Sequence, residues 1–136
     1  MEASLEARVD LKPTPRVVAA YGGGKILNVK TATSQMIGGI VWGISQALLE
    51  ETHIDRRSGR YVNSDLAEYH VPVNADIGSI DVTFVPEDDA HVNAIGAKGV
   101  REIPIVGVAG SIANAVYPAT GKRIRDLPIS LDKLIA

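Results

Sequence analysis

Apolar and polar residues alternate at the start of the chain, and this alternation predicts a half-buried β-strand. Every odd position from 5 to 11 is apolar and every even position from 6 to 12 is polar, which is the period of a strand with one covered face. Residues 16–21 predict a second strand. The prolines of residues 13–15 should form a rigid turn between the two, giving a hairpin that ends at the glycines of residues 22–24.

The next segment has the period of an amphipathic helix. Apolar side chains recur every four residues from Met36 to Leu48, which marks one buried face. We expect Thr33 or Ser34 to cap the amino-terminal end, because short polar side chains satisfy open backbone amides there. The helix should extend to Glu51.

Shorter patterns follow this helix. Residues 55–60 are polar and predict a turn, and residues 63–74 mix residue types and should be mostly irregular. Alternation returns in residues 80–85, which predicts another strand. The acidic residues 86–93 should form a loop.

A second helix is predicted near the carboxyl end. Apolar residues spaced by three and four indicate a helix from about Pro104 to Tyr117, with Pro118 helping to end it. Strands and helices alternate without the regular spacing of a doubly wound fold. We therefore expect a mixed α/β fold in a single domain, residues 1–136, with two main helices packed on a small mixed sheet.

The long helix contains glycines where simple packing would place larger residues. Gln35, Gly39 and Gly43 lie four apart and share one strip of the helix surface. An interior glycine costs about 1 kcal/mol relative to alanine, so a close contact should offset it. Either another strand or helix packs tightly on the strip, or a ligand lies across the glycines and Gln35 donates a hydrogen bond to it.

Composition excludes several classes of protein. The 136 residues, 46% of them hydrophobic, can bury one core. The 14 basic and 16 acidic residues nearly cancel, which gives no electrostatic reason for binding nucleic acid or an anionic membrane. The chain has no cysteine, so disulfides and thiolate metal sites are excluded. No apolar run approaches the roughly 20 residues of a membrane span.

Residues 96–102 hold the best candidate for chemistry, the carboxylate of Glu102. Gly96 and Gly99 allow the backbone to turn tightly and to approach a bound molecule, and the following helix would direct free amides to the same place. Glu102 could be a catalytic acid or base, or it could only complement the helix dipole. A phosphate-binding loop at residues 22–25 is rejected because Ile26 stands where Ser or Thr is required.

Five long segments of the sequence together resemble one known family, the xanthine dehydrogenase and aldehyde oxidase family. The similarity is to the carboxy-terminal part of its molybdopterin-binding subunit and covers nearly the whole chain. In order along the sequence, the segments are GGKILN, TSQMIGGIVWGISQALLEE, NSDLAEYHVP, HVNAIGAKGVRE and IANAVYPATGKRIRDLPI.

The resemblance implies an oxidoreductase that hydroxylates aldehydes or N-heterocycles. Its cofactor would be molybdenum held by a pterin, molybdopterin or its cytosine dinucleotide, with no metal ligand from the protein. Glu102 matches the family's general base, and Gln35 matches a glutamine that lies against the cofactor. The resemblance also assigns cofactor-binding backbone to Lys98, Gly99, Val100 and Arg101.

Two positions depart from the family pattern. Arg101 stands where the family usually has glycine, and Val29 stands where it often has proline. Arg101 could pair with Glu102 and lower its pKa, which would weaken it as a base, or its side chain could fill space that the cofactor needs. Alternatively, Arg101 points away or reaches an anionic group of the cofactor. We hypothesise that this loop is impaired for catalysis.

The resemblance also concerns partners, because the family's subunit is several times longer than this chain. The isolated chain should lack the cofactor and should be inactive. Expected partners are the remainder of the molybdenum subunit and the iron–sulfur and FAD subunits or domains. Apolar surface left uncovered should cause self-association, and a non-catalytic interaction module is the alternative function. Without a basic signal sequence at residues 1–3, we expect the cytoplasm, or the periplasm if a partner carries an export signal.

Overall fold

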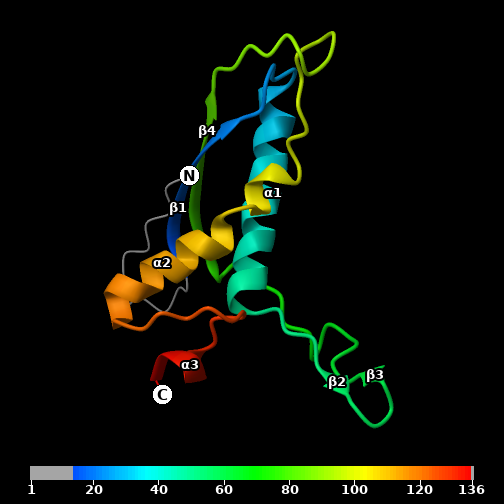
Figure 1. Ribbon diagram of the computed structural model, residues 1–136, viewed down its shortest axis with the longest axis vertical. Coiled ribbons are helices and arrows are strands. Elements are labelled where there is room, and N and C mark those ends of the chain that lie inside the picture. Colours follow the sequence, from blue (N-terminus) through cyan, green and yellow to red (C-terminus); the bar gives the residue numbers. More distant parts are fainter. Residues whose placement is uncertain (1–13, 136) are drawn as a thin grey trace.

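The computed structural model describes residues 14–135, in which two main helices pack beside a small sheet (Figure 1). The mixed α/β class is as predicted. In chain order the elements are β1 (Thr14–Gly22), α1 (Val29–Leu48), β2 (Ile54–Asp55), β3 (Arg60–Tyr61), β4 (Ile77–Val85), the 3-10 helix η1 (Ile103–Ile105), α2 (Val108–Thr120) and α3 (Leu131–Ile135).

The central sheet pairs β1 with β4 in parallel, with Thr14 opposite Ile77 and Gly22 opposite Val85. Both strands were predicted, and both are longer than the predicted segments, residues 16–21 and 80–85. The turn expected at residues 13–15 is wrong where it can be compared, because residues 14 and 15 already belong to β1. The strand expected at residues 5–12, and so the hairpin, lies outside the described residues.

α1 begins earlier than predicted because Asn28 caps it. The side chain of Asn28 accepts a hydrogen bond from the Thr31 amide at 3.1 Å, which satisfies one open donor of the first turn. Thr33 and Ser34 therefore lie inside the helix and are not its caps. The helix ends at Leu48, short of Glu51.

The core forms where the apolar face of α1 meets the sheet and α2. Met36, Ile40 and Ile44 are at most 1% exposed, as the four-residue spacing predicted. They pack with residues of β1 and α2, together with one residue that follows α2: Val17, Ala19, Tyr21, Val108, Ile112, Val116 and Ile129. Burial of this face holds α1 against both neighbours.

The glycine strip of α1 is a packing surface. A Cβ atom on Gly39 would lie 2.8 Å from Cβ of Pro104 and 3.1 Å from the carbonyl oxygen of Arg101. A Cβ atom on Gly43 would lie 2.6 Å from Cβ of Val108. Of the two alternatives for this strip, close packing is correct, and a ligand lying across Gly39 and Gly43 is wrong because protein atoms occupy that space.

The second helix is broken into two pieces. Pro104 lies in η1, and α2 starts only at Val108, after Gly107 with φ 117°. Pro118 does not end the helix, which continues to Thr120 and closes on Gly121 with φ 74°. Residues Ile103–Thr120 have a mean hydropathy of 1.3 and by length and composition alone could be a membrane span, but Gly107 interrupts them.

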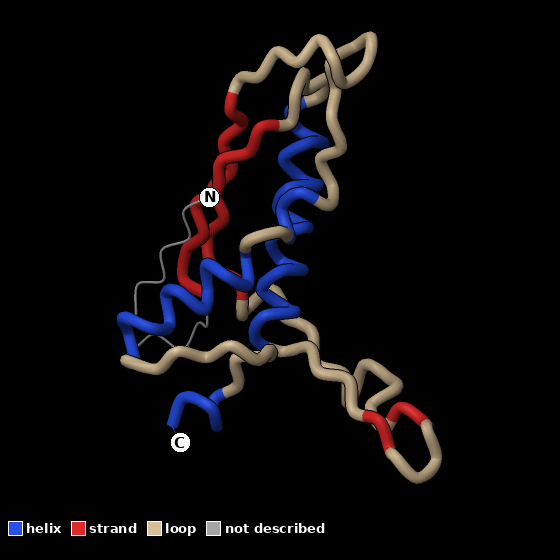
Figure 2. Tube along the Cα trace, viewed as in Figure 1, coloured by secondary structure: helices blue, strands red, loops and turns tan. Residues whose placement is uncertain are grey.

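Residues 50–76 project from the body beyond the end of α1, and we call this segment the arm (Figures 1 and 2). It carries the short antiparallel hairpin β2–β3 around the predicted polar turn, followed by the predicted irregular stretch. On the other side of the same helix end, the Ile129 amide donates to the Ala47 carbonyl at 2.7 Å and ties down the segment leading to α3.

We predict that Gly43→Ala lowers the free energy of unfolding by about 1–3 kcal/mol, because the added methyl group overlaps Val108. Gly38→Ala is the matched control. A Cβ atom there meets nothing within 4 Å, so this change should stabilise the helix by about 0.5–1 kcal/mol. Urea unfolding measures both variants, and equal effects of the two would contradict close packing at Gly43.

Candidate functional site

Two glycine segments that are far apart in the sequence lie side by side at the amino-terminal end of α1. The Lys25 amide donates to the Gly96 carbonyl at 2.8 Å, and the Lys98 amide donates to the Gly23 carbonyl at 3.3 Å. Gly24 has φ 61°, and a Cβ atom on it would collide with the Gly96 carbonyl. Glycine is required at Gly24 for both reasons.

A hollow of about 220 Å³ lies between these segments and the first turns of α1. Three of the predicted site residues, Gln35, Lys98 and Val100, line it. The other lining residues come from the first glycine loop, the start of α1 and Ala97: Lys25, Ile26, Leu27, Asn28, Thr31, Ala32 and Ala97. The lining residues include side chains with amide, hydroxyl and ammonium groups among apolar ones, which suits a ligand that needs a few directed polar contacts.

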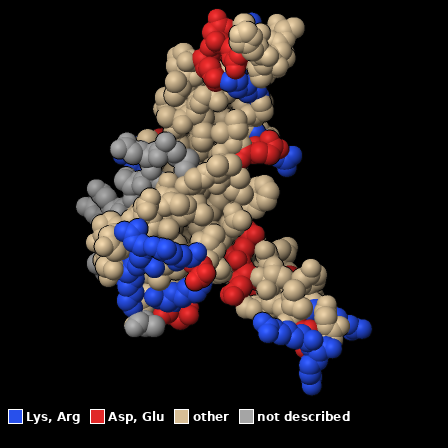
Figure 3. Space-filling view, viewed as in Figure 1, with Lys and Arg blue, Asp and Glu red and all other residues tan. Residues whose placement is uncertain are grey.

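Lys98 is held in place by two carboxylates. Its ammonium group forms an ion pair with Glu87 and lies 3.0 Å from Asp89 Oδ2. Glu87 Oε2 also accepts from the Gly24 amide at 3.2 Å. Figure 3 shows these acidic and basic side chains gathered at the top of the molecule. The acidic loop thus joins both glycine segments.

The same contacts shift the pKa values of all three groups. Hydrogen bonding to Lys98 is the main cause that lowers the pKa of Glu87 and of Asp89. The bond to Glu87, followed by that to Asp89, raises the pKa of Lys98. Lys98 therefore stays charged, but its ammonium group is engaged within the protein, and its backbone is the part that remains beside the hollow.

Glu102 lies at the end of the same run, on the exposed surface. It does not line the hollow with Gln35, but Oε2 lies 3.9 Å from where a Cβ atom on Gly99 would be, so the carboxylate folds back along the glycine run. Its side chain makes no capping hydrogen bond to η1, and α2 begins only at Val108. Complementing the dipole of a helix that starts at Pro104 is therefore not its role.

Arg101 contributes its backbone to the packing and extends its side chain to the surface. The carbonyl oxygen of Arg101 faces Gly39 of α1. Within residues 14–135, no ion pair joins Arg101 to Glu102. The pairing of Arg101 with Glu102 is therefore not seen, and the Arg101 side chain points away to the surface.

Two polar residues of the hollow were not predicted from the sequence. Asn28 and Thr31 belong to the first turn of α1, and they were missed because the cap was placed too late in the sequence. The pattern offered a usable sign, since asparagine is a preferred helix cap. Elsewhere in the described part of the chain, no cluster of His, Asp and Glu is arranged to hold a metal ion.

Residues 12–78 match the profile of the molybdopterin cofactor-binding domain. The aldehyde oxidoreductase molybdenum-binding subunit PaoC of Escherichia coli K12 is 50% identical over 120 residues, which are 88% of this chain and 16% of PaoC. The putative xanthine dehydrogenase molybdenum-binding subunit XdhA of the same strain is 38% identical over 88% of this chain and 16% of its own length. The chain belongs to the xanthine dehydrogenase and aldehyde oxidase family.

A solved structure of this family contains the same fold. The aldehyde oxidoreductase of Desulfovibrio desulfuricans ATCC 27774 superposes with a TM-score of 0.79 and 28% identity, over 90% of this chain and 13% of that chain. The chain thus spans about 16% of the curated relatives it matches. It corresponds to one segment of a molybdenum-binding subunit.

The hollow is chemically suited to part of a pterin cofactor. Gln35 has an amide group that can pair with the donors and acceptors of a pterin edge, the Asn28 amide nitrogen can donate while its oxygen caps α1, and Lys25 adds a positive charge for a phosphate. The backbone at Gly23 is close-packed, since a Cβ atom there would lie 2.8 Å from Ile26 Cδ1 and 3.3 Å from Val100 Cγ1. The absence of a side chain at Gly23 therefore lets Ile26 and Val100 pack directly against the backbone at this wall of the hollow.

We predict that Lys98→Met destabilises the chain slightly at neutral pH, because both carboxylates lose their partner. The pKa values of Glu87 and Asp89 lie below their ordinary values of 4.5 and 3.8, so their contribution is present above those values and is lost as pH falls through the lowered ones. The pKa of Lys98 lies above 10.5, so its contribution is lost as pH rises through the raised value.

The difference in urea midpoint between wild type and Lys98→Met should therefore be widest from about pH 5 to about pH 10 and should narrow on both sides. Lys25→Met is the matched control, because Lys25 has no ion pair among the described residues. A difference that failed to narrow both below and above this range would show that the ion pairs do not contribute.

Proposed function

We propose that this chain is the part of a molybdenum hydroxylase subunit that covers the pterin cofactor and supplies the general base for hydroxylating an aldehyde or N-heterocycle. The observation that carries the proposal is that Gln35, Lys98 and Val100 line one hollow, in a chain 50% identical to a molybdenum-binding subunit. The bound cofactor supplies oxygen transfer and accepts the electrons.

The residues of the hollow hold and orient the cofactor in this proposal. Gln35 projects from the second turn of α1 and offers both a donor and an acceptor. Lys98 and Val100 bring the glycine run to the wall of the hollow, whereas Gly99 and Arg101 do not line it. The ion pairs of Lys98 fix the run against the acidic loop, so the contacts are preorganised before the ligand binds.

Glu102 moves the proton. Its carboxylate lies over Gly99, next to the residues that form the wall of the hollow, and it accepts no capping hydrogen bond from η1 that would restrain it. A carboxylate in this position can accept a proton from the attacking hydroxyl group and later release it to water. Its exposure in this chain is compatible with the role, because most of the subunit that would surround it is outside this sequence.

Partners follow from the same proposal. The rest of the molybdenum-binding subunit would cover exposed apolar residues on the outer side of α1, including Trp42 at 55% exposure. Electrons would leave through iron–sulfur and FAD subunits or domains. In isolation, the uncovered surface makes the chain self-associate.

The test replaces the matching segment of the E. coli PaoC subunit with this chain and expresses the complete enzyme. Glu102→Gln should lower kcat about 10²–10⁴-fold while molybdenum content stays unchanged, because only proton transfer is lost. Glu68→Gln, an exposed glutamate on the arm, should leave kcat unchanged. Full activity in Glu102→Gln would rule out this base.

The same enzyme tests Arg101. We predict that Arg101→Gly raises kcat, because it removes a long side chain beside the proposed base. Since no ion pair with Glu102 is present among the described residues, the gain should come from space near the cofactor. Equal turnover of the two forms would show that Arg101 does not impair the loop.

A further inference from the structure

The arm exposes a group of large apolar side chains away from the core. Leu66 is 82% exposed, more than any other large apolar residue in the described chain. The others on the arm are Ile54, Tyr61, Val62, Val71 and Val73. Apolar side chains concentrated on one projecting segment are typical of a surface that another protein part covers.

The arm is nevertheless held in a defined shape by polar contacts at its base. Asn63 is buried, accepts from the His53 amide at 2.9 Å and donates to the Glu51 carbonyl at 2.6 Å. The Tyr69 hydroxyl donates to Glu50 Oε2 at 3.0 Å, which raises the pKa of Tyr69. An exposed apolar surface that is already ordered loses little entropy when it binds.

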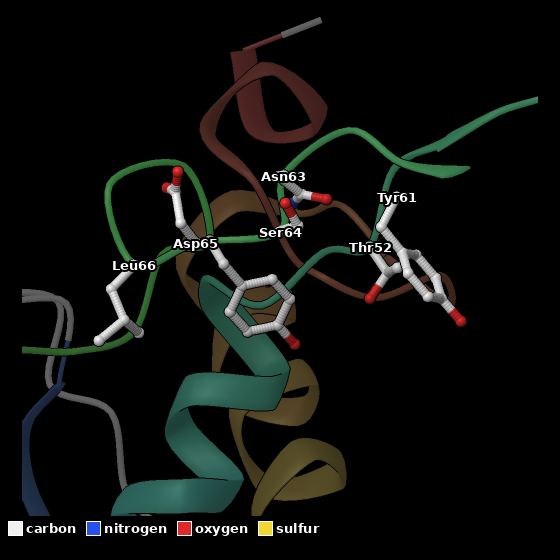
Figure 4. Close-up of a pocket in the computed structure, with 7 residues that line it drawn as sticks. Thr52, Tyr61, Asn63, Ser64, Asp65 and Leu66 are labelled. Carbon is white, nitrogen blue, oxygen red and sulfur yellow. The ribbon is translucent and has the colours of Figure 1, made fainter. Parts of the chain in front are cut away.

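A hollow of about 430 Å³ opens in the arm, lined by Thr52, Tyr61, Asn63, Ser64, Asp65, Leu66 and Tyr69. Figure 4 shows Leu66 and Tyr61 on opposite sides of it, contributed by different segments of the arm. Its size accommodates large side chains. At protein interfaces, an anchoring side chain of one partner commonly fills a hollow of this kind on the other.

We propose that the arm is a docking element and that its hollow receives an apolar or aromatic side chain from the rest of the same molybdenum-binding subunit. The inference rests on the proposed function. It is supported by the match to the cofactor-binding domain, which runs through residues 12–78 and so includes the arm. It is also supported by length, because about 84% of PaoC lies outside the matched segment, as 100% less the matched 16%.

Charge argues against a second copy of this chain as the occupant. Arg56, Arg57 and Arg60 lie at the hairpin turn of the arm, and Figure 3 shows basic side chains at its end. In a symmetric arm-to-arm dimer each patch would face its own copy, so these like charges would meet. The proposed occupant instead carries acidic groups beside its apolar anchor.

The experiment uses the complete subunit in which this chain replaces the matching segment of PaoC. Ser64→Cys places a thiol at the hollow, in a chain that has no other cysteine. Maleimide labelling at this residue, read by peptide mass spectrometry, should be slower in the complete subunit than in the isolated chain by about tenfold or more. Labelling needs no molybdenum, so the result does not depend on catalysis.

Further outcomes separate the possible occupants. Equal labelling rates in the subunit and the isolated chain would overturn the proposal. So would protection that appears only when other subunits are added, or protection of the isolated chain that grows with its concentration, since these indicate a different polypeptide or a second copy.

A series at Leu66, which lines the hollow, tests the docking site directly. In the complete subunit, Leu66→Asp should restore labelling of Ser64→Cys to within about twofold of the isolated-chain rate, while Leu66→Met keeps the protection. Because Leu66 is exposed, neither change should alter the melting temperature of the isolated chain. Full protection in Leu66→Asp would show that the hollow is not the docking site.

Discussion

The close approach of η1 and α2 to the glycines of α1 determines where every candidate functional group lies. Gly39 and Gly43 allow Pro104, Val108 and the backbone of Arg101 to rest directly on the helix. The glycine run that precedes them is therefore fixed along α1, on the side from which Gln35 projects. A larger residue at either glycine would push the run outwards and separate the two walls of the hollow.

A second constraint fixes the other end of the run. Lys98 binds two carboxylates of the acidic loop, and one of them, Glu87, also accepts from the backbone of Gly24. The run is thus held by apolar contact at Pro104 and by charge at Lys98. Between these two points lie Gly99 and Val100, whose backbone belongs to no helix or strand.

Local sequence patterns predicted which helices and strands form better than they predicted where each one ends or what it packs against. The periodicity of α1 and the alternation of residues 80–85 were sufficient to predict a helix and a strand, because burial of one face imposes both patterns. The start of α1 was missed because Asn28, Thr33 and Ser34 are all acceptable caps, and only the surrounding structure selects among them. Pro104 suits the first turn of a 3-10 helix as well as that of an α-helix, so its position could not reveal the break at Gly107.

The site was predictable only in part for the same reason. Gln35, Lys98 and Val100 were expected together and line one hollow. The engagement of the Lys98 side chain by Glu87 and Asp89 was not foreseen, because it depends on how the acidic loop folds back. The parallel direction of β1 and β4, and the two-residue strands of the arm, likewise depend on contacts between distant parts of the chain.

The parallel pairing of β1 and β4 has a consequence for how the chain assembles. Arg16 and Asp81, which join the two strands through an ion pair, are 65 positions apart. The sheet cannot form until α1 and the whole arm have emerged and a long loop has closed, and contacts of such high sequence separation slow folding. During synthesis, the apolar face of α1 would stay uncovered until β4 has emerged. Chaperones bind exposed apolar segments of this kind.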